Sequence, residues 1–202
     1  MKVLKFGGTS VQDAKRINTV LKIAAEAVKE PGGALLVSSA LSGITDNLLE
    51  IAKLARLNQK DEVSQKIDTV RQRHLDTASD LVGDSPQLLD ELTQSIEGVI
   101  TQIRSLAHGV LLLRECSPRT SDAIVGCGEL LSTLIIASAA LSRGFDAIWV
   151  DARECIRTDT TFGAAHVDFE KTDKLTLERI IPRDGRLYIS QGFIGSTTTG
   201  VT

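Results

Sequence analysis

Apolar and polar residues at the start of the chain follow a pattern that predicts a strand, a helix and a second strand. Residues 3–6 form a short, mainly apolar run that ends at two glycines, as a buried strand does. Over about 11–29 the apolar residues recur at spacings of three and four, which predicts an amphipathic helix. Residues 34–39 form a second short run, typical of a strand buried on both faces. This order indicates a βαβ unit and therefore a parallel sheet.

The middle of the chain, from residue 44 to residue 113, is almost entirely helical in pattern. We interpret the segment 46–113 as a helical insertion within an α/β protein. Pro86 follows a Gly-Asp-Ser break and suits the first turn of a helix, where its missing N–H is not needed. The predicted helices cover about 46–57, 62–81 and 87–113.

The last part of the chain returns to a mixture of helices and strands. A strongly apolar stretch predicts a helix over about 122–142, and the Arg143-Gly144 pair after it is typical of a helix C-cap. Short apolar runs at 147–150 and 187–190 predict two more buried strands, with a helix over about 175–181 between them. The whole pattern predicts an α/β fold built on a mainly parallel sheet.

Composition and charge narrow the possible functions. The 202 residues are 42% apolar, which is enough to fill a core, and their formal net charge is −3. Nucleic-acid-binding proteins usually carry a basic excess, so no nucleic-acid partner is expected. No uninterrupted apolar run approaches the roughly 18 residues of a membrane helix, and the first residues lack the features of a signal peptide. Three cysteines without CxxC spacing indicate reduced thiols in a cytoplasmic protein.

A glycine pair after the first strand is the first candidate for chemistry. Lys5 lies near the strand end, Gly7 and Gly8 follow, and Ser10 is a candidate N-cap of the next helix. Glycines let an anion approach backbone N–H groups, a helix dipole favours negative charge, and a lysine adds a full charge. The segment therefore predicts a phosphate site, although it matches neither the Walker A nor the GxGxxG pattern. Taken alone, a tight turn with a lysine explains it equally well.

The second predicted strand also leads into a small, hydroxyl-rich loop, with the sequence SSALSGIT at 38–45. In open α/β sheets ligands bind beyond the carboxyl ends of the strands, so two such loops in succession indicate one ligand crevice. Thr45 could cap the following helix or bind a ligand, because both roles use the same oxygen. The pattern leaves both roles open.

Two glycines inside an otherwise strong helix mark a third candidate. Gly126 and Gly128 each cost the helix about 1 kcal/mol relative to alanine, which indicates that another group approaches closely. Glu129 stands in the same apolar stretch. It is either a residue on the solvent side or a buried charge that meets a cation.

The remaining polar residues suggest no further site. His74, His108 and His166 lack the spacing of zinc ligands, so no metal site is predicted. The segment 157–163 could line a site, but a surface turn is the simpler interpretation. No serine lies in the context of a nucleophile elbow, so a serine hydrolase is not expected.

Four segments, taken in order, resemble one known family. They are KFGGTS at 5–10, SSALSGITDNL at 38–48, GCGELLST at 126–133 and ISQGFIGST at 189–197. Together they resemble the aspartate kinases, members of the amino-acid kinase family, over essentially the whole chain. The resemblance implies a three-layer αβα sandwich with a helical insertion. It also implies phosphate transfer from ATP to L-aspartate, giving 4-phospho-L-aspartate, the first step towards lysine, threonine and methionine.

The resemblance also implies roles for individual residues. It implies that Lys5 is catalytic and that the ATP phosphates are bound by Lys5, Gly7, Gly8 and Ser10. It implies that L-aspartate is bound by Ser39, Thr45, Glu129 and Phe193. ATP would bring Mg²⁺ with it, with no dedicated metal site in this chain, and the full-length protein would be a homo-oligomer with no membrane partner.

The family pattern continues past the last residue of this chain. It includes a GRGGSD segment, a nucleotide-binding half and ACT regulatory domains, and in some relatives a fused homoserine dehydrogenase. We therefore expect residues 1–202 to be the N-terminal, substrate-side part of an aspartate kinase, C-terminally incomplete, inactive alone and prone to self-association through an open sheet edge. One alternative is another amino-acid kinase, acting on glutamate, acetylglutamate, carbamate or a nucleotide monophosphate. The other is a non-catalytic binding or assembly module on the same fold.

Overall fold

A parallel four-stranded sheet forms the centre of the protein. The computed structural model describes residues 1–202, and the strands are ordered β1-β2-β4-β3 across the sheet. Every neighbouring pair is parallel, and the register aligns Lys5 with Val37 and Val37 with Ser190. The strands are β1 (Lys2–Phe6), β2 (Ala34–Ser38), β3 (Asp146–Val150) and β4 (Arg186–Gln191). The predicted parallel sheet is confirmed.

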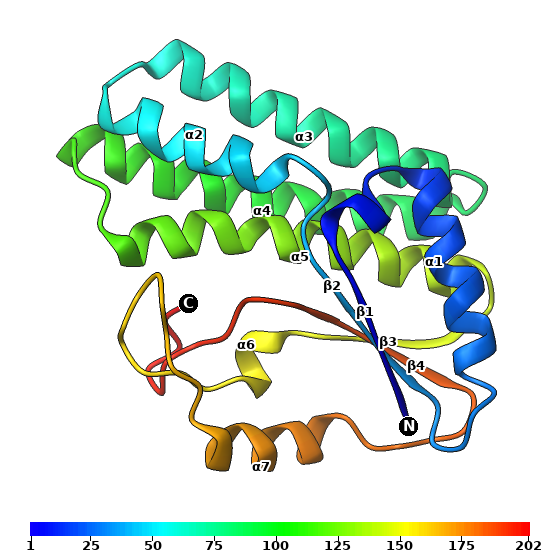
Figure 1. The fold of residues 1–202 in the computed structure, drawn as a ribbon. Helices are drawn as coiled ribbons and strands as arrows, with labels where there is room; N and C mark the ends of the chain where they lie inside the picture. The colour runs from blue at the N-terminus through cyan, green and yellow to red at the C-terminus, as the bar shows by residue number, and fades with distance from the viewer.

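Helices cover both faces of this sheet (Figure 1). On one face, the five helices from α1 through α5 pack in a large apolar cluster. The sheet contributes Leu36, Leu187 and Ile189 to this cluster. On the other face, a small cluster joins Cys155 of α6 and Ile180 after α7 to the sheet. The helices are η1 (Gly8–Val11), α1 (Ala14–Ala27), α2 (Ile44–Arg56), α3 (Lys60–Val82), α4 (Pro86–Leu113), α5 (Pro118–Ser142), α6 (Ala152–Cys155) and α7 (Phe169–Arg179). The fold is the expected three-layer αβα sandwich, and α2, α3 and α4 make up the predicted insertion.

The helix α5 lies at the centre of the molecule, between the sheet and the inserted helices (Figure 1). A Cβ at Gly128 would lie 3.0 Å from the Cβ of Ala40 and 3.1 Å from Leu48. A Cβ at Gly126 would lie 3.3 Å from Ile194. The close approach that the two helical glycines predicted is therefore present.

Two helices, α4 and α5, are long and apolar enough by composition to cross a membrane. In α5, 78% of the most apolar window is buried within the protein, as in the core helix of a globular domain. In α4 the corresponding share is 28%, and its buried side chains face α3 and α5. Length and composition are weak evidence for a span, so the absence of a membrane partner stays a prediction.

Helix ends differ from the predicted ones where a capping side chain decides them. Helix α5 begins at Pro118, ahead of the predicted 122, because the Ser117 hydroxyl accepts a hydrogen bond from the Thr120 N–H at 3.2 Å. Helix α7 begins at Phe169, ahead of the predicted 175, because Asp168 caps it in the same way. The short helix α6 was not predicted at all.

One buried histidine makes the helical layer sensitive to acid. His74 of α3 is fully buried, its Nδ1 donates to the Val70 carbonyl at 2.7 Å, and its Nε2 has no partner. Burial lowers the pKa of His74 from 6.5 to about 4. Its neutral form is therefore favoured in the folded state, while the unfolded chain takes up the proton near pH 6.5. The stability that this provides is complete above pH 6.5 and is lost as the pH falls towards 4.

We expect the pH dependence of stability to weaken in the variant His74→Gln. The wild-type free energy of unfolding should fall by up to about 3 kcal/mol more than that of the variant between pH 7 and pH 4. Urea denaturation at both pH values measures this difference, with the exposed His108→Gln as control. If the difference in free energy of unfolding between wild type and His74→Gln is the same at both pH values, the pKa of His74 is not lowered by folding.

Candidate functional site

The loops that follow the four strands meet at one edge of the sheet. Because all strands are parallel, their carboxyl ends lie at the same edge. The loops begin at Gly7 after β1, Ser39 after β2, Asp151 after β3 and Gly192 after β4. The glycine pair and the hydroxyl-rich loop, which the sequence pattern assigned to one crevice, are indeed neighbours.

The glycine loop packs tightly against the loop after β2. Gly7 precedes the short 3-10 helix η1, and a Cβ at Gly7 would meet nothing within 4 Å. At Gly8, by contrast, a Cβ would lie 2.9 Å from the carbonyl oxygen of Ala40. Gly8 is therefore needed for the two loops to approach each other, and Gly7 leaves the backbone open to solvent.

Neither predicted N-cap is correct. Ser10 lies within η1, and the cap of α1 is Asp13, whose side chain accepts a hydrogen bond from the Arg16 N–H at 2.8 Å. The cap position of α2 is Gly43, at a φ of 78° that favours glycine, and it lies two residues before Thr45. Thr45 is exposed in the first turn of α2. Its hydroxyl takes no part in capping, and its ligand-binding role stays a prediction.

Glu129 of α5 is buried, with 6% of its surface exposed. Its Oε1 accepts a long hydrogen bond of 3.4 Å from the Ala40 N–H, and its Oε2 is buried without a partner. No arginine, lysine or histidine forms an ion pair with it. Burial raises the pKa of Glu129, and the Ala40 N–H opposes this only in part. The sequence left Glu129 either on the solvent side or buried against a cation. The solvent-side position is wrong, because Glu129 is buried. No cationic side chain of the protein pairs with it.

Glu129 lines a cavity of about 570 Å³ between α5, the sheet edge and the loop 156–168. Phe193 lines it too, so the structure brings together two of the four residues assigned to the substrate. Ser39 is not among the residues that line the cavity: its N–H donates to the Phe6 carbonyl, and its own carbonyl accepts from the Ser132 hydroxyl at 2.7 Å. Thr45 and Ser10 do not line it.

The segment 157–163 forms one wall of this cavity. The sequence pattern allowed the segment 157–163 to line a site, with a surface turn as the simpler interpretation. Thr158, Asp159 and Phe162 line the cavity, while Asp159 and Gly163 are also exposed, as in a surface turn. The Gly163 N–H donates to the carboxylate of Asp122 on α5 at 2.6 Å, which fastens the loop across the opening. In the sequence, the Phe162-Gly163 pair followed by small residues is the feature that marks this loop. Its place in the cavity wall depends on the contact with α5, which the sequence does not show.

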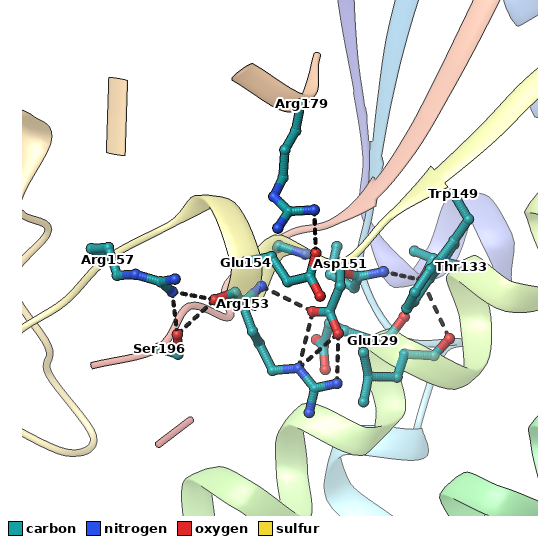
Figure 2. Close-up of polar contacts among 12 residues, drawn as sticks. Glu129, Thr133, Trp149, Asp151, Arg153, Glu154, Arg157, Arg179 and Ser196 are labelled. Atoms are coloured by element: carbon teal, nitrogen blue, oxygen red, sulfur yellow. Dashed lines mark hydrogen bonds and ion pairs between the residues drawn. The ribbon is translucent and has the colours of Figure 1, made fainter. Parts of the chain in front are cut away.

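A buried polar network links the backbone of Glu129 to the sheet (Figure 2). The Thr133 hydroxyl donates to the Glu129 carbonyl at 2.8 Å and accepts from Trp149 Nε1 at 3.0 Å and from Gln191 Nε2 at 2.7 Å. The Gln191 side-chain oxygen, Oε1, accepts in turn from the Ala152 N–H at 2.7 Å. One hydroxyl thus joins α5 to β3 and to the end of β4, which carries Phe193 two residues later.

Removing that hydroxyl should be costly for stability. The variant Thr133→Val keeps the shape but leaves the Trp149 and Gln191 N–H groups unpaired in the interior. Each unpaired donor costs about 1–3 kcal/mol, so we expect the free energy of unfolding to fall by about 2–4 kcal/mol. Trp149 is the only tryptophan, so urea denaturation followed by its fluorescence measures the loss. Thr133→Ser keeps the oxygen and should lose far less; equal losses would contradict the network.

A second set of polar contacts, around α6, fixes the segment that contains Ser196 to the sheet edge. Asp151 caps α6 and binds the Arg153 guanidinium through contacts of 2.6–3.1 Å. The Ser196 hydroxyl donates to the Arg153 carbonyl at 2.6 Å and accepts from the Arg157 guanidinium at 2.6 Å (Figure 2). These contacts hold the segment after Phe193 against the cavity wall.

Metal ligands are not gathered at this site. No three His, Cys, Asp or Glu side chains of residues 1–202 are arranged to hold a metal ion. The three cysteines are free thiols. The cavity is lined by three carboxyl side chains, those of Asp122, Glu129 and Asp159, and the exposed ammonium group of Lys5 lies over Phe193, which also lines it. This combination suits a ligand that has both a cationic and an anionic part.

Comparison with known proteins gives the same family from the sequence and from the structure. The sequence profile of the amino acid kinase family matches residues 1–201. The lysine-sensitive aspartokinase 3 of Escherichia coli is 32% identical over 201 residues, which are 99% of this chain and 42% of that protein. A chloroplastic bifunctional aspartokinase/homoserine dehydrogenase of Arabidopsis thaliana is 29% identical over 98% of this chain and 21% of that protein. The chain therefore spans 42% of the first of these relatives and 21% of the second.

Solved structures agree. The crystal structure of E. coli aspartokinase III in complex with aspartate and ADP matches the whole chain with a TM-score of 0.86 and 32% identity, over 42% of that protein. The aspartate kinase of Clostridium acetobutylicum, at 21% identity and a TM-score of 0.69, shares the fold. The resemblance to aspartate kinases that the four sequence segments carried is confirmed.

Proposed function

The chain belongs to the amino acid kinase family, and we propose that it forms the acceptor-binding part of an aspartate kinase. The reaction is ATP + L-aspartate → ADP + 4-phospho-L-aspartate, the first step towards lysine, threonine and methionine. An oxygen of the aspartate side-chain carboxylate attacks the γ-phosphorus of ATP, and the bond to the β-phosphate oxygen breaks as ADP leaves.

The observation that carries this proposal is the buried carboxylate of Glu129. Its Oε2 has no partner, and the residue lines a cavity large enough for an amino acid. A buried carboxylate without a cation is unfavourable, and the α-ammonium group of a substrate would supply the missing charge. Ser39, Thr45 and Phe193 are the other residues proposed for the aspartate, and Phe193 lines the same cavity as Glu129. The relative from E. coli was solved with aspartate and ADP.

The phosphate side of the proposed site is the loop after β1. Phosphoryl transfer depends mainly on positioning and on stabilising the charge of the transferred group. Lys5 supplies a positive charge, and the open backbone at Gly7 can be approached by an anion, while Gly8, packed against the loop after β2, is proposed to add a second N–H group. Ser10 lies in η1, close behind the glycines in sequence, and is proposed as a further contact to the phosphates.

No three His, Cys, Asp or Glu side chains of this chain are placed to hold a metal ion together. In nucleotide sites Mg²⁺ is usually held by one or two carboxylates together with the substrate phosphates. We propose that Mg²⁺ enters with the ATP phosphates. We also propose a cytoplasmic location, in keeping with the three free cysteines.

The competing members of the family differ in the acceptor. Acetylglutamate and carbamate carry no free α-ammonium group, so they would leave Glu129 without a cation. Glutamate keeps the ammonium but is one methylene longer. The test is an ADP-release assay of the full-length protein with ATP and each acceptor in turn. We expect turnover with L-aspartate, and turnover only with another acceptor would overturn the proposal.

Packing at Gly8 allows a sharper test of the phosphate loop. In Gly8→Ala the added Cβ would lie 2.9 Å from a backbone carbonyl oxygen, so one of the two loops must move. Small misplacements of a binding group are costly, and we expect kcat/KM for ATP to fall roughly 10- to 100-fold. Gly98→Ala in α4 adds the same methyl group where nothing lies within 4 Å, and should leave kcat/KM unchanged. Unchanged kinetics in Gly8→Ala would argue against a phosphate site here.

A further inference from the structure

Phe193 has an unfavourable environment for a large aromatic residue. Its side chain is 83% exposed, more than any other large apolar residue of the chain. Its φ is 61°, in the left-handed region that bulky side chains rarely adopt. Its neighbour Gly192 would be the easier residue to place there, yet the strained position falls on the phenylalanine. Strained residues of this kind gather at functional sites because the surrounding structure holds them in place.

The ring has one specific partner, the ammonium group of Lys5. The Lys5 Nζ lies 4.7 Å from the centroid of the Phe193 ring, within the range of a cation–π interaction. Lys5 forms no ion pair with any carboxylate of the chain. The sheet register explains the meeting: Lys5 of β1 aligns with Val37 of β2, and Val37 aligns with Ser190 of β4, three residues before Phe193.

The same ring lines the cavity that contains Glu129. Phe193 is therefore the residue that touches both halves of the proposed site, the acceptor cavity and the lysine of the phosphate loop. We propose that Phe193 is a positioning residue for Lys5. Its ring, directed by the left-handed backbone, holds the ammonium group at the mouth of the cavity, where the phosphoryl group would be transferred. The role of the held ammonium in phosphoryl transfer rests on the proposed function; the contact itself does not.

The contact has a direct spectroscopic signature. Protons above the face of an aromatic ring are shifted upfield by the ring current. In chain 1–202 labelled with 13Cε-lysine, the Lys5 1Hε signal, assigned by its loss in Lys5→Arg, should lie upfield of the other lysine signals. In Phe193→Leu it should move to the position of the others, and in Phe193→Tyr it should stay upfield. A Lys5 signal that is the same in wild type and in Phe193→Leu would overturn the proposal.

Two further variants separate loss of the ring from loss of folding. Phe193→Gly removes the ring and suits the backbone φ of 61°, so it should fold at least as well as wild type and still lose the upfield shift. Phe169→Leu removes another exposed ring, 72% exposed at the start of α7, and should leave the Lys5 signal in place. A shift that survives in Phe193→Gly, or disappears in Phe169→Leu, contradicts the assignment of the ring.

Kinetics of the full-length protein test the consequence. At exposed sites a cation–π contact corresponds to a roughly two- to fivefold effect, so we expect kcat to fall by that factor in Phe193→Leu and to recover in Phe193→Tyr. In a Lys5→Ala background, Phe193→Leu should cause no further loss of kcat, because there is no ammonium left to position. A full additional loss in that background would show that Phe193 acts independently of Lys5. If the acceptor is not aspartate, the upfield shift persists and only the proposed function fails.

Discussion

Replacing Lys5 with alanine in the full-length protein should lower kcat by roughly 100-fold or more, the scale of losing one group that stabilises the transition state. Lys5 stands near the end of β1, just before the glycine loop, where it brings a full positive charge, and its ammonium group lies over the ring of Phe193. Charge builds up on the transferred phosphoryl group, and little else in this loop can balance it. Steady-state kinetics with ATP and L-aspartate measure the effect.

The same strand supplies a control for this variant. Lys2 is also exposed on β1, but it aligns with Ala34 at the other end of the sheet. Lys2→Ala removes an equal charge and should keep kcat close to wild type. A Lys5→Ala enzyme with near-normal kcat, or equal losses in both variants, would contradict the role of Lys5 and leave only a general electrostatic effect.

The second large effect is expected at Glu129. Glu129→Gln keeps the size of the side chain and removes its charge. If Glu129 pairs with the substrate ammonium, losing one partner of such a buried pair costs about 2–5 kcal/mol, so KM for aspartate should rise about 30-fold or more while KM for ATP changes little. The exposed Glu154→Gln, which loses only a surface pair with Arg179, is the matched control. Equal changes in both KM values would indicate a structural role instead.

Although Glu129→Gln should weaken aspartate binding, we expect it to increase the stability of the fold. Burial raises the pKa of Glu129, so folding favours its protonated form. The stability linked to this carboxyl is complete below the pKa of the unfolded chain and is lost as the pH rises through the higher pKa of the folded state. At pH 7 the ionised carboxylate therefore opposes folding, and Glu129→Gln should raise the midpoint of urea denaturation. A lowered midpoint at pH 7 would show that the charge is compensated within the protein.

The pH dependence of binding follows from the same raised pKa. Only the ionised carboxylate attracts an ammonium group, so aspartate should bind more weakly as the pH falls through the pKa of Glu129. Protein stability and substrate affinity thus place opposite demands on this side chain, as is common for residues kept for function.

Much of the fold is determined by the sequence over short distances. The four strands are short apolar runs, and the long helices have apolar residues at helical spacing, so both could be located within a few residues. Pro86 at the start of α4 and Gly144 after α5, with a φ of 79°, act through their own backbone preferences. The glycine loop could be recognised as a candidate phosphate site for the same reason, since its chemistry lies within six consecutive residues.

Where local preferences compete, the tertiary structure determines which residue caps a helix and where a short helix forms. Ser10 and Thr45 are both suitable capping residues, yet Asp13 and Gly43 occupy the caps because the chain must first complete η1 and turn at the end of the β2 loop. The helix α6 has only four residues, too few for a periodic pattern, and its first N–H is held by the side chain of Gln191 on β4.

The site itself depends on contacts that no local pattern contains. Glu129 is buried because α5 packs under the loop after β2, 89 residues away at Ala40, and the sequence alone left it either solvated or buried. The loop 156–168 became a cavity wall through Asp122 of α5, and Lys5 meets Phe193 only because β2 places β1 and β4 at the same level. Periodicity and capping act within a few residues of the chain. Burial, cavity shape and pairing between distant side chains arise from the order of strands in the sheet, and for that reason only the tertiary structure could decide them.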